Sequence, residues 1–423
     1  MMSIRAYCRI PEIRKNSHRS KEGSCPQLLY DYIDELKYAS EIHIAIYLFN
    51  NEILLDALEK LAAEGCKVHI TTLPPNGYSE KKLKVEGFQE KISGRDLAVA
   101  CYSRIKKNKL IRLKFFPHQY MWYGALYAGG GASYSFHIKV AFVKFKKRRT
   151  KCFIGSGNFM VTDPDHSDNY VIIENEKEYT QAFEKFFLDL EKYSIDATKF
   201  PKKCPTMKEE FLYTFSGNEI SLNPSSYQNC FFAAPFYLYG TQGSNHFAGN
   251  RIISLINKAK KRIWICSQHF HDLISFDPAR ETIIGELYKK TKLKNKINFK
   301  FLKQVPHSSL ADKRRAGIAE TLFQFVMQAD QRVNRLVHDK FMIIDNILLV
   351  STGNFTPSQF AFGQRKMTYE ESLKGKKIKI KKDDNFSEVN GYVIFKKNAS
   401  LLKKFEKHFL TLWDLSQDIE LEL

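Results

Sequence analysis

Two short segments of the chain carry the residues best suited to chemistry. The first runs from Ser135 to Phe159 and the second from Leu336 to Phe355. Each has a histidine two residues before a lysine, then an apolar run, a turn, a second apolar run and a Gly-Asn-Phe tail. An imidazole can attack phosphorus or carry a proton, and an ammonium group can neutralise a phosphate oxygen. Each segment therefore has the parts for phosphoryl chemistry.

The spacing predicts that each histidine and its lysine act from one face of a strand, because residues i and i+2 of a strand project the same way. The return strand then brings a hydroxyl and an amide to the same place. These are Ser156 and Asn158 in the first segment, and Thr352 and Asn354 in the second. A hairpin with ordinary polar residues on its solvent face explains one such copy well. It does not explain two copies with matching tails.

The pattern HxKxxxxD followed by GSxN, present twice, resembles the phospholipase D superfamily of phosphodiesterases. The resemblance implies a two-step phosphoryl transfer that uses no metal or other cofactor, at a cleft where both motifs meet. One histidine would form a phosphohistidine and the other would protonate the leaving oxygen. Family analogy makes His137 the nucleophile and His338 the acid, although the sequence alone does not separate these roles. The residues matching the motif are His137, Lys139, Ser156, Asn158, His338, Lys340, Asp345, Thr352 and Asn354.

The first motif departs from the family pattern at one position, where Lys144 replaces the acidic residue. Tyrosyl-DNA phosphodiesterases also lack this acid and remain active. The family further tends to place an acidic residue on a later strand, where it orients a catalytic histidine. Aligning DNYVII with NGYVIF suggests Asp168 and Asn390 for this task, with Glu174 and Glu388 as neighbouring candidates. Each of these can equally be an ordinary strand residue.

Helices and strands alternate in both halves of the chain. This predicts an α/β protein of two similar lobes, each a mixed sheet flanked by helices, arranged as a pseudo-twofold pair. We expect lobes at residues 26–196 and 227–423 and a linker at 197–226. The expected helices are 27–40, 50–65, 179–193, 250–261, about 280–290 and 399–413. The expected strands are 41–49, 66–73, 168–173, 262–268, 296–302 and 390–395.

The net charge of +20 predicts a polyanionic partner, either nucleic acid or an anionic membrane surface. Residues 101–151 contain thirteen Lys or Arg and no acid, and residues 287–311 contain seven lysines and no acid. Because these windows adjoin the motifs, we expect the basic charge to lie near the site. The candidate nucleic-acid-binding residues are Lys144, Lys146, Lys147, Arg148 and Arg149. A further basic stretch near Lys374 is either a nucleic-acid-binding loop or a solvated insertion.

Other features limit the class of protein. Eight scattered cysteines exclude CxxC zinc spacing and a dense disulfide framework. The N-terminus does not resemble a signal peptide and no apolar run is long enough to span a membrane, which predicts a cytoplasmic protein. Two aromatic stretches, at 115–124 and 231–240, either stack nucleobases, bind acyl chains or form core.

Lipid and nucleic-acid phosphodiesters present the same bond, so the motif does not choose between them. The charge favours a nuclease acting on DNA or RNA, with tyrosyl-DNA phosphodiesterase activity as a subcase. The alternatives are a phospholipase or transphosphatidylase working at an anionic membrane, and a catalytically weak nucleic-acid-binding protein that keeps the fold. The intact histidine–lysine pairs count against the last of these.

Overall fold

The computed structural model places most of the chain, and the structural statements below concern those residues alone. The described residues are 3–15, 21, 26–73, 94–116, 136–160, 165–199, 220–234, 236–240, 242–270, 282–292, 297–304, 317–356, 363–373, 376–385 and 388–418.

The first lobe is built on an eight-stranded mixed sheet in the order β1-β7-β6-β5-β2-β3-β4-β8. Its central strands β2, β3 and β4 are parallel, and the others join antiparallel. The strands are β1 (Ser3–Arg9), β2 (Ala39–Ile46), β3 (Lys67–Thr72), β4 (Ile111–Phe115), β5 (Lys139–Phe145), β6 (Thr150–Gly155), β7 (Asp168–Glu174) and β8 (Ile195–Asp196). The helices are α1 (Gln27–Glu35), α2 (Glu52–Ala63), α3 (Gly94–Asn108) and α5 (Lys177–Lys192).

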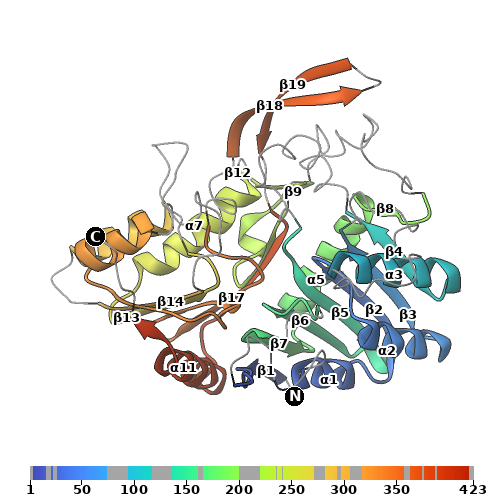
Figure 1. Cartoon of the computed structure of the whole chain (residues 1–423), viewed down its shortest axis with the longest axis horizontal. Helices are drawn as coiled ribbons and strands as arrows, with labels where there is room; N and C mark the ends of the chain where they lie inside the picture. Colours follow the sequence, from blue (N-terminus) through green and yellow to red (C-terminus); the bar gives the residue numbers. More distant parts are fainter. Residues whose placement is uncertain are drawn as a thin grey trace.

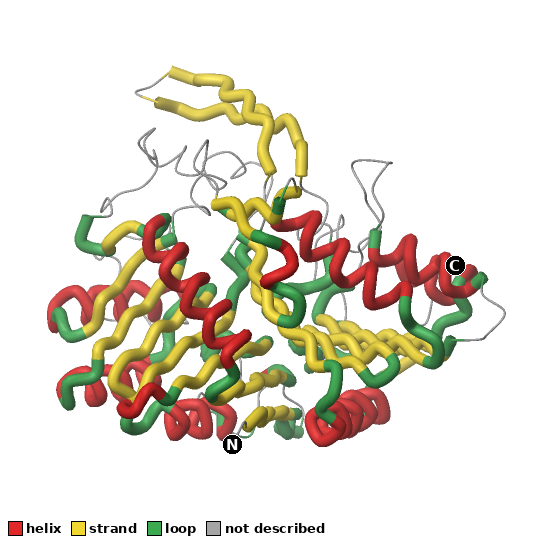
Figure 2. Tube along the Cα trace, turned by 180° about the vertical axis from the view of Figure 1, so that it is seen from behind, coloured by secondary structure: helices red, strands yellow, loops and turns green. Residues whose placement is uncertain are grey.

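The second lobe repeats this sheet strand for strand, in the order β10-β20-β17-β16-β13-β14-β15-β21. The strands are β10 (Cys230–Ala233), β13 (Arg262–Ser267), β14 (Asn298–Lys303), β15 (Asp330–Val333), β16 (Lys340–Ile344), β17 (Ile347–Ser351), β20 (Asn390–Phe395) and β21 (Gln417–Asp418). Its helices are α7 (Ser244–Asn257), α8 (Ile283–Thr291) and α11 (Ala399–Asp414). Figure 1 and Figure 2 show the two lobes side by side, each a sheet flanked by helices. The predicted fold class is confirmed.

The first sheet includes an edge strand that precedes the predicted lobe. β1 pairs antiparallel with β7 along its whole length, from Ser3 opposite Glu174 to Arg9 opposite Asp168. Its counterpart β10 pairs in the same way with β20. In the predicted linker, β9 (Ile220–Leu222) pairs with β11 (Tyr237–Tyr239), which pairs in turn with β12 (Gln242–Gly243). The exact lobe boundaries stay predictions.

The last helix of each lobe, α5 or α11, also contacts the other lobe. α5 of the first lobe contacts β10 of the second, and α11 of the second contacts β1 of the first. Tyr179 on α5 donates to the main-chain oxygen of Ile394 at 3.3 Å, and Lys404 on α11 donates to that of Ala6. Both helices carry apolar side chains at helical spacing, so each must bury one face. Part of the surface that covers the apolar face of each helix belongs to the other lobe.

The central strands β5 and β6 are covered on both sides. Tyr32 of α1 packs on one face, with its ring 5.1 Å from that of Phe153. The next residue, Ile154, projects from the opposite face and lies close to Gly391 of β20. A side chain added at Gly391 would place its Cβ 3.3 Å from Ile154. β6 also contacts β17 across the lobe boundary. The motif-bearing strands of the two lobes are therefore direct neighbours.

The described parts of the two aromatic stretches form core. Phe231, Phe232, Phe236, Tyr237 and Tyr239 are all at most 3 % exposed. Side chains buried to this extent cannot stack on a nucleobase or bind an acyl chain, so those two interpretations are wrong for this stretch. In the other stretch Phe115 and Phe116 are buried as well, and positions 117–124 lie outside the described residues.

A two-stranded hairpin interrupts the second lobe between β17 and β20. It consists of β18 (Gly363–Leu373) and β19 (Lys376–Asn385), and Figure 1 shows it rising away from both lobes. β19 contains most of the basic stretch that the sequence indicated as a loop, so this segment is a strand.

Candidate active site

The two histidine–lysine pairs lie at the beginnings of equivalent strands. His137 precedes β5 and His338 precedes β16, and both lysines are the first residues of their strands. All four side chains are buried. Lys139 Nζ donates to the main-chain oxygen of His137 at 2.9 Å, and Lys340 Nζ donates in the same way to that of His338. Each lysine therefore holds the backbone that carries its own histidine.

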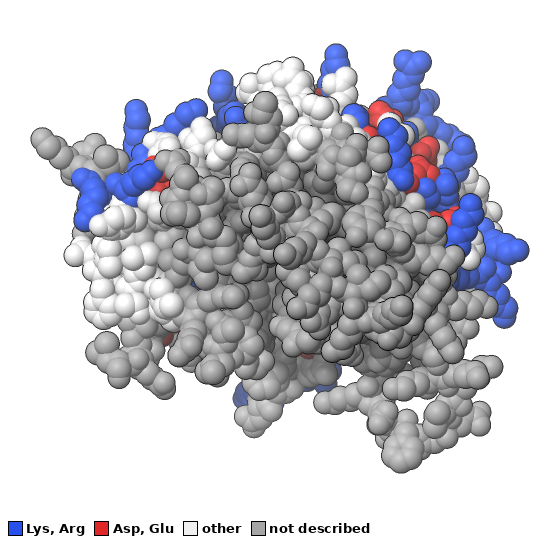
Figure 3. Space-filling view, turned by 90° about the horizontal axis from the view of Figure 1, so that it is seen from above, with Lys and Arg blue, Asp and Glu red and all other residues white. Residues whose placement is uncertain are grey.

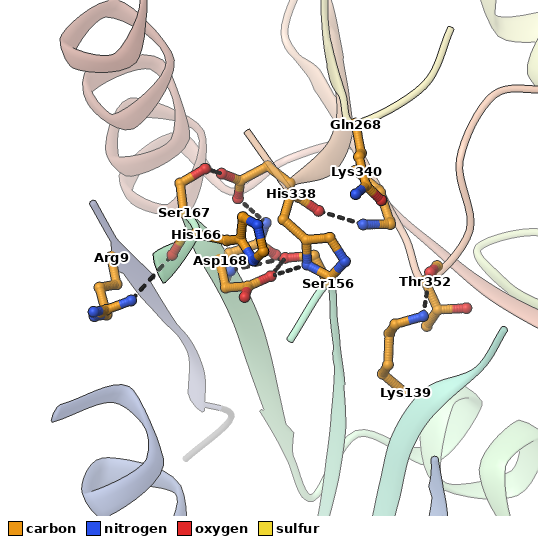
Figure 4. A network of polar contacts seen from close by, with 12 residues as sticks. Arg9, Lys139, Ser156, His166, Ser167, Asp168, Gln268, His338, Lys340 and Thr352 are labelled. Carbon is orange, nitrogen blue, oxygen red and sulfur yellow. Dashed lines mark hydrogen bonds and ion pairs between the residues drawn. The ribbon is translucent and has the colours of Figure 1, made fainter. Parts of the chain in front are cut away.

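The two motifs meet across the lobe boundary. Lys139 Nζ of the first lobe also donates to the main-chain oxygen of Thr352 in the second, at 3.3 Å. The charges of Lys340 and His338 act on His137 strongly enough to lower its pKa, and Lys139 acts likewise on His338. In Figure 4, Asp168 approaches His338 from one side while Lys139 and Lys340 lie toward the other. Parts of both lobes thus surround one small volume.

A carboxylate from the first lobe binds the histidine of the second. Asp168 Oδ1 lies 2.8 Å from Nδ1 of His338, and both residues are buried. The same oxygen accepts the hydroxyl proton of Ser156 at 2.7 Å, and Ser156 Oγ accepts the N–H of Asn169 at 3.0 Å. A carboxylate at Nδ1 keeps the proton on that nitrogen and leaves Nε2 to react.

The second lobe repeats this arrangement with an amide. Thr352 Oγ1 accepts the N–H of Gly391 at 2.9 Å and donates to Asn390 Oδ1 at 3.4 Å. Both motif hydroxyls are thus hydrogen bonded to the first residue of the neighbouring strand. These hydroxyls therefore hold Asp168 and Asn390 in place.

The motif amides are better placed to meet a phosphate. Asn158 is 4 % exposed and Asn354 is 8 % exposed. The Oδ1 atom of each is buried and has no hydrogen-bond partner within the described ranges. Because an amide can turn to present its NH₂ instead, each can donate to an anionic oxygen. A buried polar group without a partner is costly, and a bound phosphate would remove that cost.

Burial dominates the electrostatics of the site. It lowers the pKa of His137 well below the usual value, and the charges of Lys139 and Lys340 lower it further. Burial also lowers the pKa of His338, with added effects of Lys340 and His166. For Asp168, burial raises the pKa to about 6 against the opposing charge of Lys340. A phosphodiester anion between the lysines would raise the pKa of both histidines.

Asp345 does not join the cluster, which corrects its assignment as a catalytic residue. It lies at the other end of β16 from Lys340, about 16 Å along the strand. Its carboxylate accepts main-chain N–H groups of Lys260, Lys261 and Arg262 at 2.8, 2.8 and 3.0 Å. The motif acid therefore fastens the hairpin turn to the start of β13.

The first lobe makes the equivalent contact with the charges reversed. Lys144, which stands in place of the acid, lies 3.7 Å from Glu41 and 3.0 Å from Glu184. In the second lobe Asp345 corresponds to Lys144, and Arg262 corresponds to Glu41. There the main-chain N–H of Arg262 donates to the Asp345 carboxylate, and its guanidinium donates to the main-chain oxygen of Asp345. The missing acid of the first motif is thus replaced by a different local contact.

The basic turn between β5 and β6 also lies away from the site, contrary to expectation. Lys146, Lys147, Arg148 and Arg149 are exposed, but they follow the far end of β5 from Lys139. Arg149 lies 3.4 Å from Glu174, the last residue of β7. Glu174 is therefore at the opposite end of β7 from Asp168, and it lies away from His338. On the face seen in Figure 3, the described Lys and Arg side chains lie along the rim, with Asp and Glu among them on one side.

Two further histidines lie beside His137 and His338 and were not identified from the sequence. The ring of His166 is 5.6 Å from that of His338, and His269 is near enough to His137 to lower its pKa. Isolated histidines carry no pattern that could have revealed them. Glu388, two residues before Asn390, is buried at the start of β20.

One group of three metal-ligand side chains occurs within the described residues. Glu41, His43 and His69 lie on neighbouring strands β2 and β3, with ligand atoms within 4.8 Å of one another. The group shares no residue with the histidine–lysine cluster. In the described ranges, no helix is both long and apolar enough to cross a membrane.

Comparisons with known proteins agree with this geometry. The family model described as "Cardiolipin synthase, PLD-like domain" matches residues 32–190 and 252–374. A phosphatidylserine synthase from Haemophilus influenzae has a similar fold, with a TM-score of 0.57 and 12% identity over 92% of this chain and 85% of its own. None of the curated proteins compared with the chain matches it.

Two other solved structures are more distant. A polyphosphate kinase from Porphyromonas gingivalis has a TM-score of 0.48 and 10% identity over 96% of this chain, which spans half of the kinase's length. A yeast tyrosyl-DNA phosphodiesterase has a TM-score of 0.44 and 10% identity, covering 87% of this chain and 86% of its own. Since the family model matches one region in each lobe, together more than half of the chain, this protein belongs to the phospholipase D superfamily of phosphodiesterases.

Proposed function

We propose that this protein is a metal-independent nuclease that cleaves DNA or RNA through a phosphohistidine. The observation that carries the phosphodiesterase chemistry is the cross-lobe cluster, in which Asp168 binds His338 and Lys139 reaches Thr352. A single lobe would hold half of these groups. The cluster therefore supports a reaction that needs two histidines with different tasks.

Asp168 supports a division of labour between the histidines. Its carboxylate contacts His338 at 2.8 Å, whereas the equivalent residue of the second lobe is the neutral Asn390. An anionic partner favours the protonated imidazole, as a general acid requires. His137, whose neutral form is favoured by burial and by both lysines, then suits the nucleophile.

The reaction proceeds in two displacements. A nitrogen of neutral His137 attacks phosphorus, the P–O bond to the leaving group breaks, and that oxygen takes a proton from His338. His338, now neutral, next removes a proton from water, and the hydroxide attacks phosphorus as the P–N bond breaks. His137 returns to its neutral state and His338 to its protonated state. The two ammonium groups and the amides of Asn158 and Asn354 stabilise the non-bridging oxygens.

The lysine-rich hairpin favours nucleic acid over a lipid headgroup. The sequence of β19 contains Lys377, Lys379 and Lys381. The strand ends at Asn385, five residues before Asn390, so the base of the hairpin is within about 18 Å of a site residue. A lysine-rich strand that ends near the site suits a chain of phosphates, and the net charge of +20 agrees.

A phospholipase or transphosphatidylase remains the second candidate. The matching family model is named for cardiolipin synthase, and the phosphatidylserine synthase shares the fold. Such an enzyme would use the same two histidines on a lipid phosphodiester.

A substrate panel in EDTA tests the proposal. Labelled single- and double-stranded DNA and RNA, and vesicles containing phosphatidylcholine or phosphatidylglycerol, are incubated with the protein. We expect cleavage of nucleic acid that is lost in His137→Ala and kept in His43→Gln, a control histidine outside the cluster. Headgroup release without nucleic-acid cleavage would establish the lipid enzyme instead. Loss of cleavage in EDTA would contradict the metal-free mechanism, and salt-sensitive binding without turnover would identify a binding protein.

A further inference from the structure

A second buried carboxylate lies directly beside the catalytic pair of the second lobe. Asp339 stands between His338 and Lys340 in the sequence, and its side chain is 0 % exposed. Strand alternation directs it away from the face used by its two neighbours. The mechanism described above does not use it.

Asp339 binds the first-lobe segment that presents Asp168. Its Oδ2 accepts the hydroxyl of Ser167 at 2.6 Å, and its Oδ1 accepts the side-chain amide of Asn169. These two residues flank Asp168 on either side. The main-chain N–H of Ser167 also donates to Leu336 of the second lobe at 2.6 Å. The Asp339 carboxylate is thus hydrogen bonded to both residues that flank Asp168.

A histidine on the closing helix completes this network. His408 of α11 lies with Nε2 3.0 Å from Asp339 Oδ2, and both are buried. Burial alone would raise the pKa of Asp339, but His408 and the donors of the first lobe hold it below its usual value. Asp339 is therefore a carboxylate whose oxygens contact three side chains, two from the segment at the start of β7 and one from α11.

The first lobe shows that joining the lobes does not require these polar groups. Aligning FEKFFLDL of α5 with FEKHFLTL of α11 places Phe186 opposite His408, and the motifs place Ile138 opposite Asp339. The strand alignment pairs Ser167 with Val389 and Asn169 with Gly391. The residues equivalent to Asp339, His408, Ser167 and Asn169 thus have no polar side chain, and the position equivalent to Asp168 is Asn390. The polar contacts of Asp339 occur beside Asp168, the carboxylate that contacts His338.

We propose that Asp339, held by His408, is a positioning residue that fixes the main chain around Asp168 and so keeps this carboxylate directed at His338 Nδ1. This inference rests on the proposed function, in which His338 is the general acid. If Asp168 turned away, the protonated ring of His338 would lose its anionic partner, and Nε2, which faces the leaving oxygen, would give up its proton more readily. The neutral ring could also take the other tautomer, in which Nε2 carries the proton and cannot accept one from water.

The test compares two phosphodiesters that differ in their need for an acid. A dinucleotide has a poor leaving group that must be protonated, whereas bis(4-nitrophenyl) phosphate releases a stable phenolate without help. We expect Asp339→Asn to lower turnover of the dinucleotide by about 10–100-fold and to change hydrolysis of the nitrophenyl ester little. His408→Phe, which copies the first lobe, should act in the same direction, and His408→Gln, which keeps an N–H donor, should restore activity.

Asp189→Asn provides the matched control. Asp189 is another buried carboxylate, which accepts from Lys185 and from Tyr237, but it lies on α5 outside the catalytic cluster. Its substitution should lower the melting temperature without changing the ratio of the two activities. If Asp339→Asn lowers both activities by one factor, or lowers neither, Asp339 is only a structural residue and the proposal is overturned.

A readout without turnover separates this inference from the proposed function. In ¹⁵N spectra of the imidazole side chains, we expect His338 to carry its proton on Nδ1 in the parent protein. In Asp339→Asn the two tautomers should be mixed, even if no nucleic acid is cleaved. An unchanged His338 spectrum in that variant and in His408→Phe would overturn the positioning role, whatever the substrate proves to be.

Discussion

The two lobes have the same strand order but carry different groups at their catalytic ends. In the second lobe His338 has a carboxylate at 2.8 Å, supplied by the first lobe. The position equivalent to that carboxylate is the neutral Asn390, which is hydrogen bonded to Thr352. Duplication of a lobe thus supplies two similar histidines, and the residues Asp168 and Asn390 make their surroundings different. This difference is the basis of the separate acid and nucleophile roles that we propose.

The two sheets also carry different polar residues at equivalent positions of their neighbouring central strands. Glu41, His43 and His69 of the first lobe occupy the positions of Arg262, Trp264 and Lys300 in the second. In the first lobe the imidazoles stack at 4.6 Å, and in the second the two cations lie over the Trp264 ring at 4.8 and 6.0 Å. Polar residues on these covered faces are satisfied in each lobe by its own local partners. The fold therefore tolerates opposite charges at equivalent sites.

Removing the two catalytic histidines in turn should give the largest effect. We expect His137→Ala and His338→Ala each to lower turnover of a nucleic-acid substrate by at least about 10³-fold. With an activated aryl phosphodiester only His338→Ala should still release a first equivalent of phenolate rapidly, because that leaving group needs no proton in the first step. Samples quenched in alkaline denaturant, which preserves the acid-labile P–N bond, should carry label on His137. Equal release by both variants would contradict the division of roles.

Exchanging the groups that orient the histidines should have a smaller effect. Asp168→Asn should lower turnover by about 10–100-fold. Without the carboxylate the pKa of His338 falls further, so the decline of kcat at high pH should move to lower pH. Asn390→Asp, which gives the second lobe a carboxylate as well, should change turnover less. A pH profile that is the same in the parent protein and in Asp168→Asn would show that this carboxylate does not act on the acid.

The turn contacts should affect stability and leave catalysis alone. Asp345→Ala removes the acceptor of three main-chain N–H groups at a position with φ of 51°. We expect it to lower the free energy of unfolding by about 2–3 kcal/mol. Lys144→Ala, at the equivalent position, breaks partly exposed ion pairs and should cost at most about 1 kcal/mol. Urea unfolding measures both, and an unchanged kcat in folded Asp345→Ala would agree with its placement outside the site.

The hairpin occurs at one of the two equivalent positions, between β17 and β20, and its lysines should affect binding. Replacing Lys377, Lys379 and Lys381 together by Gln should weaken binding of an oligonucleotide about tenfold at moderate salt. The slope of log K against log salt should become shallower by roughly 2–3, because each phosphate contact contributes about 0.9. Replacing Lys146, Lys147 and Arg148 in the remote turn is the matched control and should change the slope less. The reverse order would assign nucleic-acid binding to the turn.

A pH effect confined to the first lobe should be the smallest. Burial lowers the pKa of His69 to about 4, so the unfolded chain binds a proton there more readily between pH 6.5 and 4. Stability contributed by this residue is therefore lost as the pH falls through that range. His69→Gln should recover about 1 kcal/mol at pH 5 relative to pH 8, after allowance for its partial exposure. Thermal melts at the two pH values measure the difference, and an equal effect at both would exclude a protonation effect.

Much of the local structure could be predicted from the sequence. The helix at 399–413 and the strands at 168–173 and 390–395 lie within a residue of their predicted bounds, because apolar periodicity is a local property. β1 and β10 were missed as edge strands, since β1 is short and mixed in polarity and β10 lies in an aromatic run that also suits other roles. Placing the basic turn at 146–149 near the site was wrong, because sequence proximity does not say at which end of a strand a turn lies.

By itself the sequence determined the repeated His-x-Lys motif, the two lobes and the superfamily, since each depends on short patterns that strands and helices impose on neighbouring residues. Tertiary structure alone decided that Asp168 binds a histidine of the opposite lobe, that Asp339 grips the segment around it, and that Asp345 fastens a turn. Those contacts join residues far apart in the chain, and they form where the ends of β5, β7 and β16 meet at the boundary between the lobes.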